Sequence, residues 1–393
     1  MSLDALRGFD MFWILGADGV VTALHKLSDA APIRLLAGQV DHSEWAGFTF
    51  YDLIFPLFVF ITGVSMVFSI SRTLEQCGRA AAVRRILIRS AILFLLGILY
   101  NGGVSHVWPG VRLMGVLQRI ALAYAVAGIL FCCLGFRGRT AVGVLLLALY
   151  WALLTFVPIR NVALEKNTVA AQLGTVRPTA AQVSQLYAGT TTMVTGRYEP
   201  GLNLANHLDY LYLPGAKYDT YWDPEGLLST LPAISTCLLG VMAGCCLRRS
   251  DRTSRQKLMR LIVTGAVCVL LGWFWSAEFP VVKKIWTSSF VLVAGGYSLL
   301  LLAAFYYLVD VREWRGWCRP FVWIGLNPIT LYLATALIDF GRIAEHLAGG
   351  SVAAFLDRHL TAGAGDLGLA VTMLGLLLAL ARFLHHRQIF LRI

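Results

Sequence analysis

Long apolar blocks are the feature that most restricts what this chain can fold into. A helix needs about 20 predominantly apolar residues to cross the hydrocarbon core of a bilayer. Inside hydrocarbon every backbone amide has to be paired within its own segment, so such blocks have to be helices. We expect spans at 8–25, 52–71, 86–103, 114–135, 140–158, 227–247, 258–275, 286–308, 320–339 and 366–384. Only 14% of the residues are charged, against about a quarter in a soluble domain. The sequence therefore predicts an all-α integral membrane protein with about ten transmembrane helices in a single domain, 1–393.

Basic residues gather in alternate loops, and this pattern orients the chain. They are Arg72, Arg79, Arg84 and Arg85, then Arg137 and Arg139, then Arg248, Arg249, Arg252, Arg255 and Lys257, then Arg312 and Arg315, and Arg387 and Arg392 in the tail. Positive charge marks the cytoplasmic side. We therefore expect both termini in the cytoplasm and the loops 26–51, 104–113, 159–226, 276–285 and 340–365 outside. Orientation in a lipid bilayer explains the net charge of +11, and nucleic acid is not an expected partner.

The longest outward segment, 159–226, is an extracytoplasmic loop insertion. It contains many Tyr and Trp residues and shows little helical periodicity. Long loops of this kind are often functional. Two interpretations stay open, a folded loop packed over the membrane mouth and a lid over a polar cavity.

The cysteines and the N-terminus indicate neither a disulfide framework nor a cleaved leader. The chain has eight cysteines, and none falls in the loops that we expect outside. Neither Cys-Cys pair has a second pair at the spacing of a zinc site, so we expect no metal. The first apolar block lacks both a basic stretch ahead of it and a small-residue cleavage site, so we do not expect a cleavable signal.

A histidine and an aspartate at the start of the second span are the first candidates for chemistry. His42 and Asp52 lie in the outward segment that runs into Leu53-Ile54-Phe55-Pro56. Imidazole titrates close to neutral pH, and a carboxylate fixes its tautomer and raises its basicity, which suits a general base. The two residues need a turn between them to meet. The alternative is an interfacial histidine beside an aspartate that caps a helix.

Polar residues that interrupt the fourth span are further candidates. Gln118 and Arg119 stand in the otherwise apolar run Gly115–Tyr124. An intramembrane charge usually faces a cavity or a partner. Arg119 either binds an anionic group, pairs with Asp52, or extends to the nearby outer interface.

Two other spans contain signs of a break. Asp18 in the first span is flanked by Gly16 and Gly19, and a broken helix that carries a carboxylate usually lines a cavity. Asn327-Pro328 predicts a second break in the span 320–339. The alternative for this pair is a simple kink capped by the asparagine.

Several blocks in a fixed order carry a family resemblance. They are SLDALRGFDMFWI at 2–14, HSEWAGFTFYDLIFPLFVFITGVS at 42–65, GVLQRIALAY at 115–124, DPEGLLSTLPAISTCLLGVMAG at 223–244 and GLNPITLYL at 325–333. The chain resembles the heparan-alpha-glucosaminide N-acetyltransferase family, including its bacterial membrane acyltransferases. The block with His42, Trp45, Gly47 and Asp52 is the specific one, since other membrane acyltransferases share the first.

The resemblance implies acetyl transfer from cytosolic acetyl-CoA to the amine of a glucosamine-like sugar or glycan across a bacterial inner membrane. It implies His42 as the catalytic residue and Asp52 as its partner, through direct transfer or through an acetyl-histidine. Candidates for holding the sugar are Trp45, Gln118, Arg119, Asn327, Asp18 and Glu225. Candidates for the phosphates of CoA are, by location, Arg72, Arg84, Arg85 and Arg248.

Three expectations remain open at the sequence level. One alternative function is a transporter for sugars or small anions, because broken helices and intramembrane charges suit it equally well. Another is O-acetylation of an exported glycan in the same pocket. A homodimer is a further possible assembly.

Overall fold

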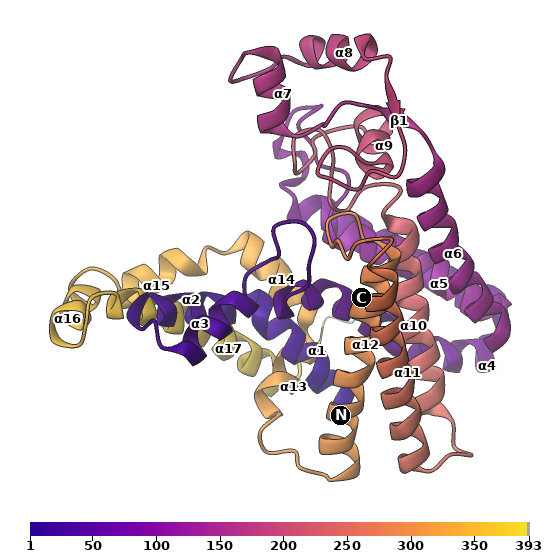
Figure 1. Cartoon of the computed structure of the whole chain (residues 1–393). Coiled ribbons are helices and arrows are strands. Elements are labelled where there is room, and N and C mark those ends of the chain that lie inside the picture. The colour runs from indigo at the N-terminus through magenta and orange to yellow at the C-terminus, as the bar shows by residue number, and fades with distance from the viewer. Residues whose placement is uncertain (391–393) are drawn as a thin grey trace.

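Helices dominate the computed structural model, which describes residues 1–390 (Figure 1). Within those residues, seven helices are long and apolar enough to cross a membrane. The number is eight if α13 (Arg319–Leu326) and α14 (Pro328–Leu337), bent by 74°, form one broken span. The predicted all-α membrane class is confirmed. The predicted count of about ten spans is not confirmed.

The longest helix, α4 (Phe50–Tyr100), contains a reversal of the chain at Gly78. Its φ of 81° is a conformation that glycine adopts at no steric cost. Arg85 Nη1 donates to Thr73 Oγ1 at 2.8 Å, whereas a straight helix would separate these residues by about 18 Å. The two arms, 50–77 and 79–100, therefore lie antiparallel and correspond to the predicted spans 52–71 and 86–103.

The centre of the molecule is a bundle in which α10 packs against α4, α5 and α6, and α11 packs against α12. The bundle helices are α5 (Val116–Cys133), α6 (Phe136–Phe156), α10 (Thr230–Arg248), α11 (Ser254–Trp275) and α12 (Ser288–Phe305), which continues into the π-helix η3 (Tyr306–Val311). Glycines let the backbones of α4 and α10 meet. A Cβ on Gly63 would lie 2.1 Å from the Cys237 carbonyl oxygen, and one on Gly240 would lie 2.0 Å from that of Phe60. Close approach at small residues is typical of packed membrane helices.

The first predicted span is broken, as the glycines around Asp18 indicate. The π-helix η1 (Trp13–Ala17) joins α1 (Ser2–Phe12) to α2 (Asp18–Leu27), with φ 117° at Gly16. Helix α1 stays in the bundle and packs on α13. The second predicted break is also present, at Asn327 between α13 and α14.

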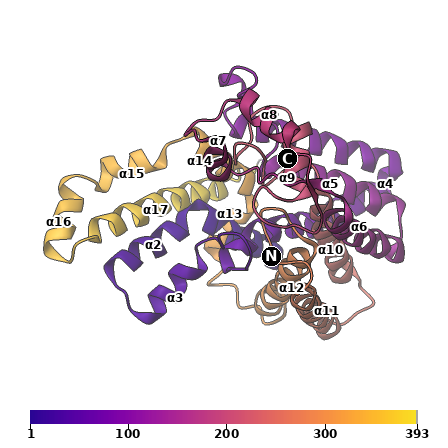
Figure 2. The ribbon, with the colours of Figure 1, turned by 45° about the horizontal axis from the view of Figure 1, so that its top comes forward.

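Beyond Gly16 the chain enters an arm that projects to one side of the bundle, clear in both views (Figures 1 and 2). The arm contains α2, α3 (Ala31–Gln39), α15 (Phe340–Ala348), α16 (Ser351–His359) and α17 (Ala364–His386). Its apolar core includes Met11 and Leu15 together with Leu377 and Ala381 of α17. The arm therefore packs onto the bundle along the segment where the first span breaks.

The segment 159–226, which we call the cap, lies at the upper end of the bundle in Figure 1. The sequence shows little helical periodicity here, yet short helices form. The cap contains α7 (Lys166–Leu173), α8 (Ala180–Gly189), α9 (Leu204–Tyr212) and the antiparallel strands β1 (Ile159–Arg160) and β2 (Met193–Val194). These helices are short, and Val169 of α7 and Val183 of α8 pack in one apolar cluster with the loop residues Val162, Leu164 and Trp222. The short 3₁₀ helix η2 (Gly103–Ser105) lies outside the cap, directly after α4.

Candidate active site

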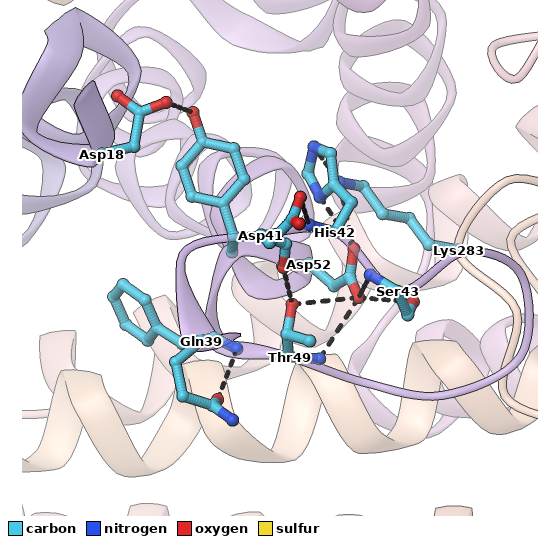
Figure 3. A network of polar contacts seen from close by, with 10 residues as sticks. Asp18, Gln39, Asp41, His42, Ser43, Thr49, Asp52 and Lys283 are labelled. Carbon is cyan, nitrogen blue, oxygen red and sulfur yellow. Dashed lines mark hydrogen bonds and ion pairs between the residues drawn. The ribbon is translucent and has the colours of Figure 1, made fainter. Parts of the chain in front are cut away.

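His42 and Asp52 meet in the structure. His42 Nδ1 lies 2.9 Å from Asp52 Oδ1, with the imidazole half exposed and the carboxylate fully buried (Figure 3). The required turn is a capping box at the start of α4. Thr49 is the N-cap, its hydroxyl accepts from the Asp52 N–H, and its own N–H donates to Asp52 Oδ2 at 3.2 Å. This local motif satisfies two unpaired helix donors and directs the carboxylate back towards the preceding loop.

The two oxygens of Asp52 have separate partners. Oδ2 accepts from the Ser43 hydroxyl at 2.7 Å and from the Ser43 and Thr49 backbones. Oδ1 faces His42, and Lys283 Nζ lies 3.4 Å from the same oxygen. The carboxylate is thus immobilised on one side and presents one oxygen to the imidazole, which is what a group that orients a base requires.

Lys283 contacts both members of the His42–Asp52 dyad, and the sequence analysis did not single it out. Its Nζ lies 3.0 Å from His42 Nδ1 and 3.3 Å from Nε2. An antiparallel bridge, Ala46 to Val282, and the hydrogen bond from Gly47 N–H to the Val281 carbonyl at 2.9 Å hold the two loops together. The one available signal was two consecutive lysines in a loop, 276–285, where the charge rule disfavours them.

Two cavities of opposite character share His42 and Tyr51 in their walls. The smaller, about 250 Å³, has mostly apolar walls from Met11, Ile14, Ile54, Phe55, Phe58, Val116, Leu117, Ile120 and Ile329, with His42, Tyr51, Glu225, Lys283 and Tyr332 as its polar groups. The larger, about 550 Å³, is lined by Asp18, Thr22, His25, Arg34, Ala37, Gly38, Val40, Asp41, His42 and Tyr51. The imidazole therefore has access to an apolar space on one side and a polar space on the other.

Two of the six predicted sugar-binding residues line these cavities. Asp18 faces the polar one and accepts from the Tyr51 hydroxyl at 2.9 Å (Figure 3). Glu225 faces the apolar one, and Arg112 Nη2 donates to it at 2.8 Å. Burial raises the pKa of Glu225, opposed by the charges of Arg119 and Arg112.

The other four candidates line neither cavity; three of them have hydrogen-bond partners, whereas the buried amide atoms of Gln118 have none within residues 1–390. Trp45 Nε1 donates to the Tyr198 carbonyl at 2.7 Å, which joins the His42 loop to the cap. Gln118 faces Gly97 on the second arm of α4. Asn327 Nδ2 donates to the Ile389 carbonyl at 2.9 Å.

The sequence allowed Arg119 to bind an anion, to pair with Asp52 or to extend to the outer interface, and the structure shows it fully buried with other partners. Its guanidinium donates to the Pro224 carbonyl and to the Ser229 hydroxyl and lies 4.8 Å from the Trp286 ring centre. It therefore secures the cap segment that carries Glu225. The first turn of α5 directs it there, and Lys283 has the position beside Asp52 instead.

The predicted phosphate-binding arginines lie at the other end of the first arm of α4. Arg248 Nη2 contacts Glu75 at 2.6 Å, and both side chains are exposed. Arg84 lines a cavity of about 910 Å³ together with Arg79. From Asp52 to Arg72 a straight helix rises about 30 Å, the thickness of a hydrocarbon core. His42 and these arginines therefore lie at opposite ends of one membrane-length helix.

No metal centre is found among residues 1–390, where no group of three or more His, Cys, Asp or Glu could hold an ion. The cysteines described there are free thiols, several of them buried in the bundle.

Comparison with known proteins agrees with the family resemblance. Residues 1–175 match the family model described as heparan-alpha-glucosaminide N-acetyltransferase, catalytic. The match contains His42, Asp52 and Arg119. The predicted family resemblance is confirmed.

Two curated proteins called heparan-alpha-glucosaminide N-acetyltransferase extend the likeness beyond the matched segment. The one from Mus musculus is 28% identical over 335 residues, and the one from Homo sapiens is 29% identical over 335 residues. Each alignment covers 76% of this chain and 49% of the relative. The matched region thus spans about half the length of these N-acetyltransferases.

Proposed function

We propose that the protein is a transmembrane acetyltransferase that moves acetyl from acetyl-CoA to the amine of a glucosamine-like sugar. The observation that carries this proposal is the position of His42. It is held by a buried carboxylate in the wall shared by an apolar and a polar cavity. A base between two such spaces can act on two unlike substrates at once.

The apolar cavity suits the donor. It extends inward along α4 from Ile54 to Phe58 and is walled on the opposite side by α5, so an uncharged acyl-thioester arm fits it better than a sugar does. The phosphates of CoA would remain at the exposed basic end, where Arg72, Arg84, Arg85 and Arg248 are the candidates.

The polar cavity suits the acceptor. The carboxylates of Asp18 and Asp41 can accept from hydroxyls and from an ammonium group, while Thr22 and His25 offer further hydrogen bonds. Charge-assisted hydrogen bonds of this kind are about twice as strong as neutral ones. An amino sugar matches this lining better than a neutral sugar does.

The chemical step follows from the two positions. The bound ammonium group first loses one proton to solvent, and His42 Nε2 then removes a proton from the resulting neutral amine as its nitrogen bonds to the thioester carbon. The C–S bond then breaks, and the CoA thiolate takes the proton from the imidazolium. Asp52 holds Nδ1 and stabilises the charge on the ring. Direct transfer is favoured over an acetyl-histidine, since both cavities reach His42 together.

The membrane setting is part of the same proposal. We propose that the protein lies in the inner membrane of a bacterium, and we infer from the distribution of Arg and Lys that both termini and the basic loops face the cytoplasm. The cap then forms an extracytoplasmic insertion in a single domain, and it supplies Glu225 to the donor cavity. A homodimer is tested by the mass of the purified protein in nanodiscs.

The experiment is an acetyl transfer assay with protein purified in nanodiscs. Wild type should release free CoA when given acetyl-CoA and glucosamine, and acetyl-CoA should raise its melting temperature. Glucose, which lacks the amine, should not be acetylated; if it is, O-acetylation is the function. A different result would establish a transporter instead: the protein releases no CoA, acetyl-CoA does not raise its melting temperature, and sugar is taken up into vesicles.

A further inference from the structure

Lys283 is placed by backbone structure rather than by a flexible loop. The bridge between Ala46 and Val282 fixes the residue before it. Val282 N–H donates to Thr287 Oγ1 at 3.0 Å, and Thr287 N–H donates to the Val282 carbonyl at 3.2 Å, which closes the turn after it. Only 19% of the Lys283 side chain is exposed. Its ammonium group is therefore held in one position before any substrate binds.

The donor and acceptor inventory fixes how the ammonium group contacts the dyad. An ammonium group donates and never accepts, and a neutral imidazole has one donor and one acceptor nitrogen. With Nδ1–H donating to Asp52 Oδ1 at 2.9 Å, the acceptor is Nε2, 3.3 Å from Lys283 Nζ. This tautomer is assigned from the hydrogen-bond network. Nζ also lies 3.0 Å from Nδ1, so Lys283 contacts the ring edge that carries both nitrogens, next to the one that accepts the proton in the proposed reaction.

Lys283 is also the cation that the donor cavity offers. It lines the cavity together with His42 and Glu225. Arg112 is engaged with Asp223 and Glu225, and Arg119 with Pro224 and Ser229. Burial lowers the pKa of Lys283, opposed by the nearby charge of Asp52. A poorly hydrated ammonium group gains more from a developing negative charge than one in water does.

We propose that Lys283 is a catalytic residue whose ammonium group donates to the thioester carbonyl oxygen as that oxygen becomes negative. This inference rests on the proposed acetyl transfer and names a group for a separate task within it. When the amine attacks, the carbonyl electron pair moves onto oxygen and Lys283 stabilises it there. When the carbonyl re-forms and the C–S bond breaks, the oxygen returns to neutral and Lys283 keeps its proton. Aimed donors of this kind raise kcat without tightening substrate binding.

The test compares Lys283→Met with Lys284→Met in nanodiscs. Lys284 is the adjacent lysine and lines neither cavity. Lys283→Met should lower kcat by about 10²–10³-fold, the usual cost of one oxyanion donor, with the KM for acetyl-CoA within about threefold of wild type. Lys284→Met should keep wild-type kcat. A kcat for Lys283→Met close to wild type, or a loss confined to KM, would overturn the assignment.

A second variant and its melting temperature separate catalysis from folding. If Lys283→Met does not fold, Lys283→Gln keeps a neutral donor and should lower kcat by at least tenfold at a wild-type melting temperature. Wild-type kcat in Lys283→Gln would refute the need for a cation. Failure of the proposed function can be told apart from failure of the Lys283 assignment, because in the first case the wild-type protein itself releases no CoA.

Discussion

The two ends of the first arm of α4 carry charged groups in contrasting environments. At one end Asp52 is fully buried and bonded to His42, Ser43 and Thr49. At the other end Arg248 and Glu75 form an ion pair whose side chains are 43% and 60% exposed. Buried, fully bonded groups are fixed in geometry, whereas exposed ion pairs contribute about 0–1 kcal/mol and are screened by salt. Substitutions at the first end should therefore affect the chemistry, and those at the second should adjust donor affinity.

The largest effect is expected at His42. His42→Ala should lower kcat by about 10³-fold, within the range that general base catalysis contributes, and leave the melting temperature unchanged because the ring is half exposed. Steady-state CoA release measures it, with His106→Ala, at an exposed histidine on another loop, as a matched control. Normal acetyl transfer by His42→Ala would refute the dyad.

Asp52→Asn should come next, with kcat lower by about 10²-fold because the amide no longer fixes the imidazole tautomer. It should also lower the melting temperature, since Lys283 loses its compensating charge. Calorimetry and CoA release measure the two effects. If the melting temperature of Asp52→Asn equals that of wild type, the charge of Asp52 does not stabilise the partly buried Lys283.

Asp18→Asn should change acceptor binding alone. We expect the KM for glucosamine to rise about tenfold, the value of one hydrogen bond to a charged group, with the KM for acetyl-CoA unchanged. Glu44→Gln, an exposed carboxylate beside the site, serves as the control. Equal changes in both KM values would show that the two cavities do not separate the substrates.

Arg248→Gln tests the exposed end. We expect the KM for acetyl-CoA to rise only a few-fold, and less at high salt, because an exposed charge is screened. Arg249→Gln, whose partner is Asp251, is the control. If the KM and its salt dependence stay at wild-type values, Arg248 has no part in donor binding.

The smallest expected effect is on the pH dependence of cap stability. Burial raises the pKa of Asp209 to about 7, opposed by hydrogen bonds from the Leu227 and Asp223 backbones. Since the folded pKa exceeds the unfolded one, its stabilising contribution is complete below about pH 4 and is lost as pH rises towards 7. Asp209→Asn should therefore gain melting temperature relative to wild type between pH 5 and pH 7.5. If the melting temperatures of wild type and Asp209→Asn change with pH in parallel, the raised pKa of Asp209 is contradicted.

The contrast also explains what could be predicted from sequence. Apolar block length gave the helices, and Gly16, Asp18 and Asn327-Pro328 indicated both breaks, because these signals are local. The sequence marked His42 and Asp52 as a candidate pair but left their meeting open, and the structure supplies the turn as a capping box of Thr49 and Asp52 within the same short segment. The local pattern carried enough information wherever a single helix or turn decided the geometry.

Contacts between distant segments were not predictable in the same way. Lys283 lies beside Asp52 because an antiparallel bridge between Ala46 and Val282 joins their two loops, and no sequence spacing predicts this bridge. The sequence left three possible roles open for Arg119, and the direction of α5 sends its guanidinium to Ser229 instead of to Asp52. The cap helices were missed because their apolar residues pack on one another over short turns. Tertiary placement, rather than residue type, decided each case.

The most direct test of the central claim separates the two substrates by a membrane. Protein is reconstituted into sealed vesicles that enclose acetyl-CoA, with labelled glucosamine supplied only outside, and the outer medium is analysed for the N-acetyl product. If His42 joins a donor cavity to an acceptor cavity across the bilayer, product appears outside while CoA accumulates inside, and His42→Ala forms none. If product forms only when both substrates share one compartment, the account is contradicted.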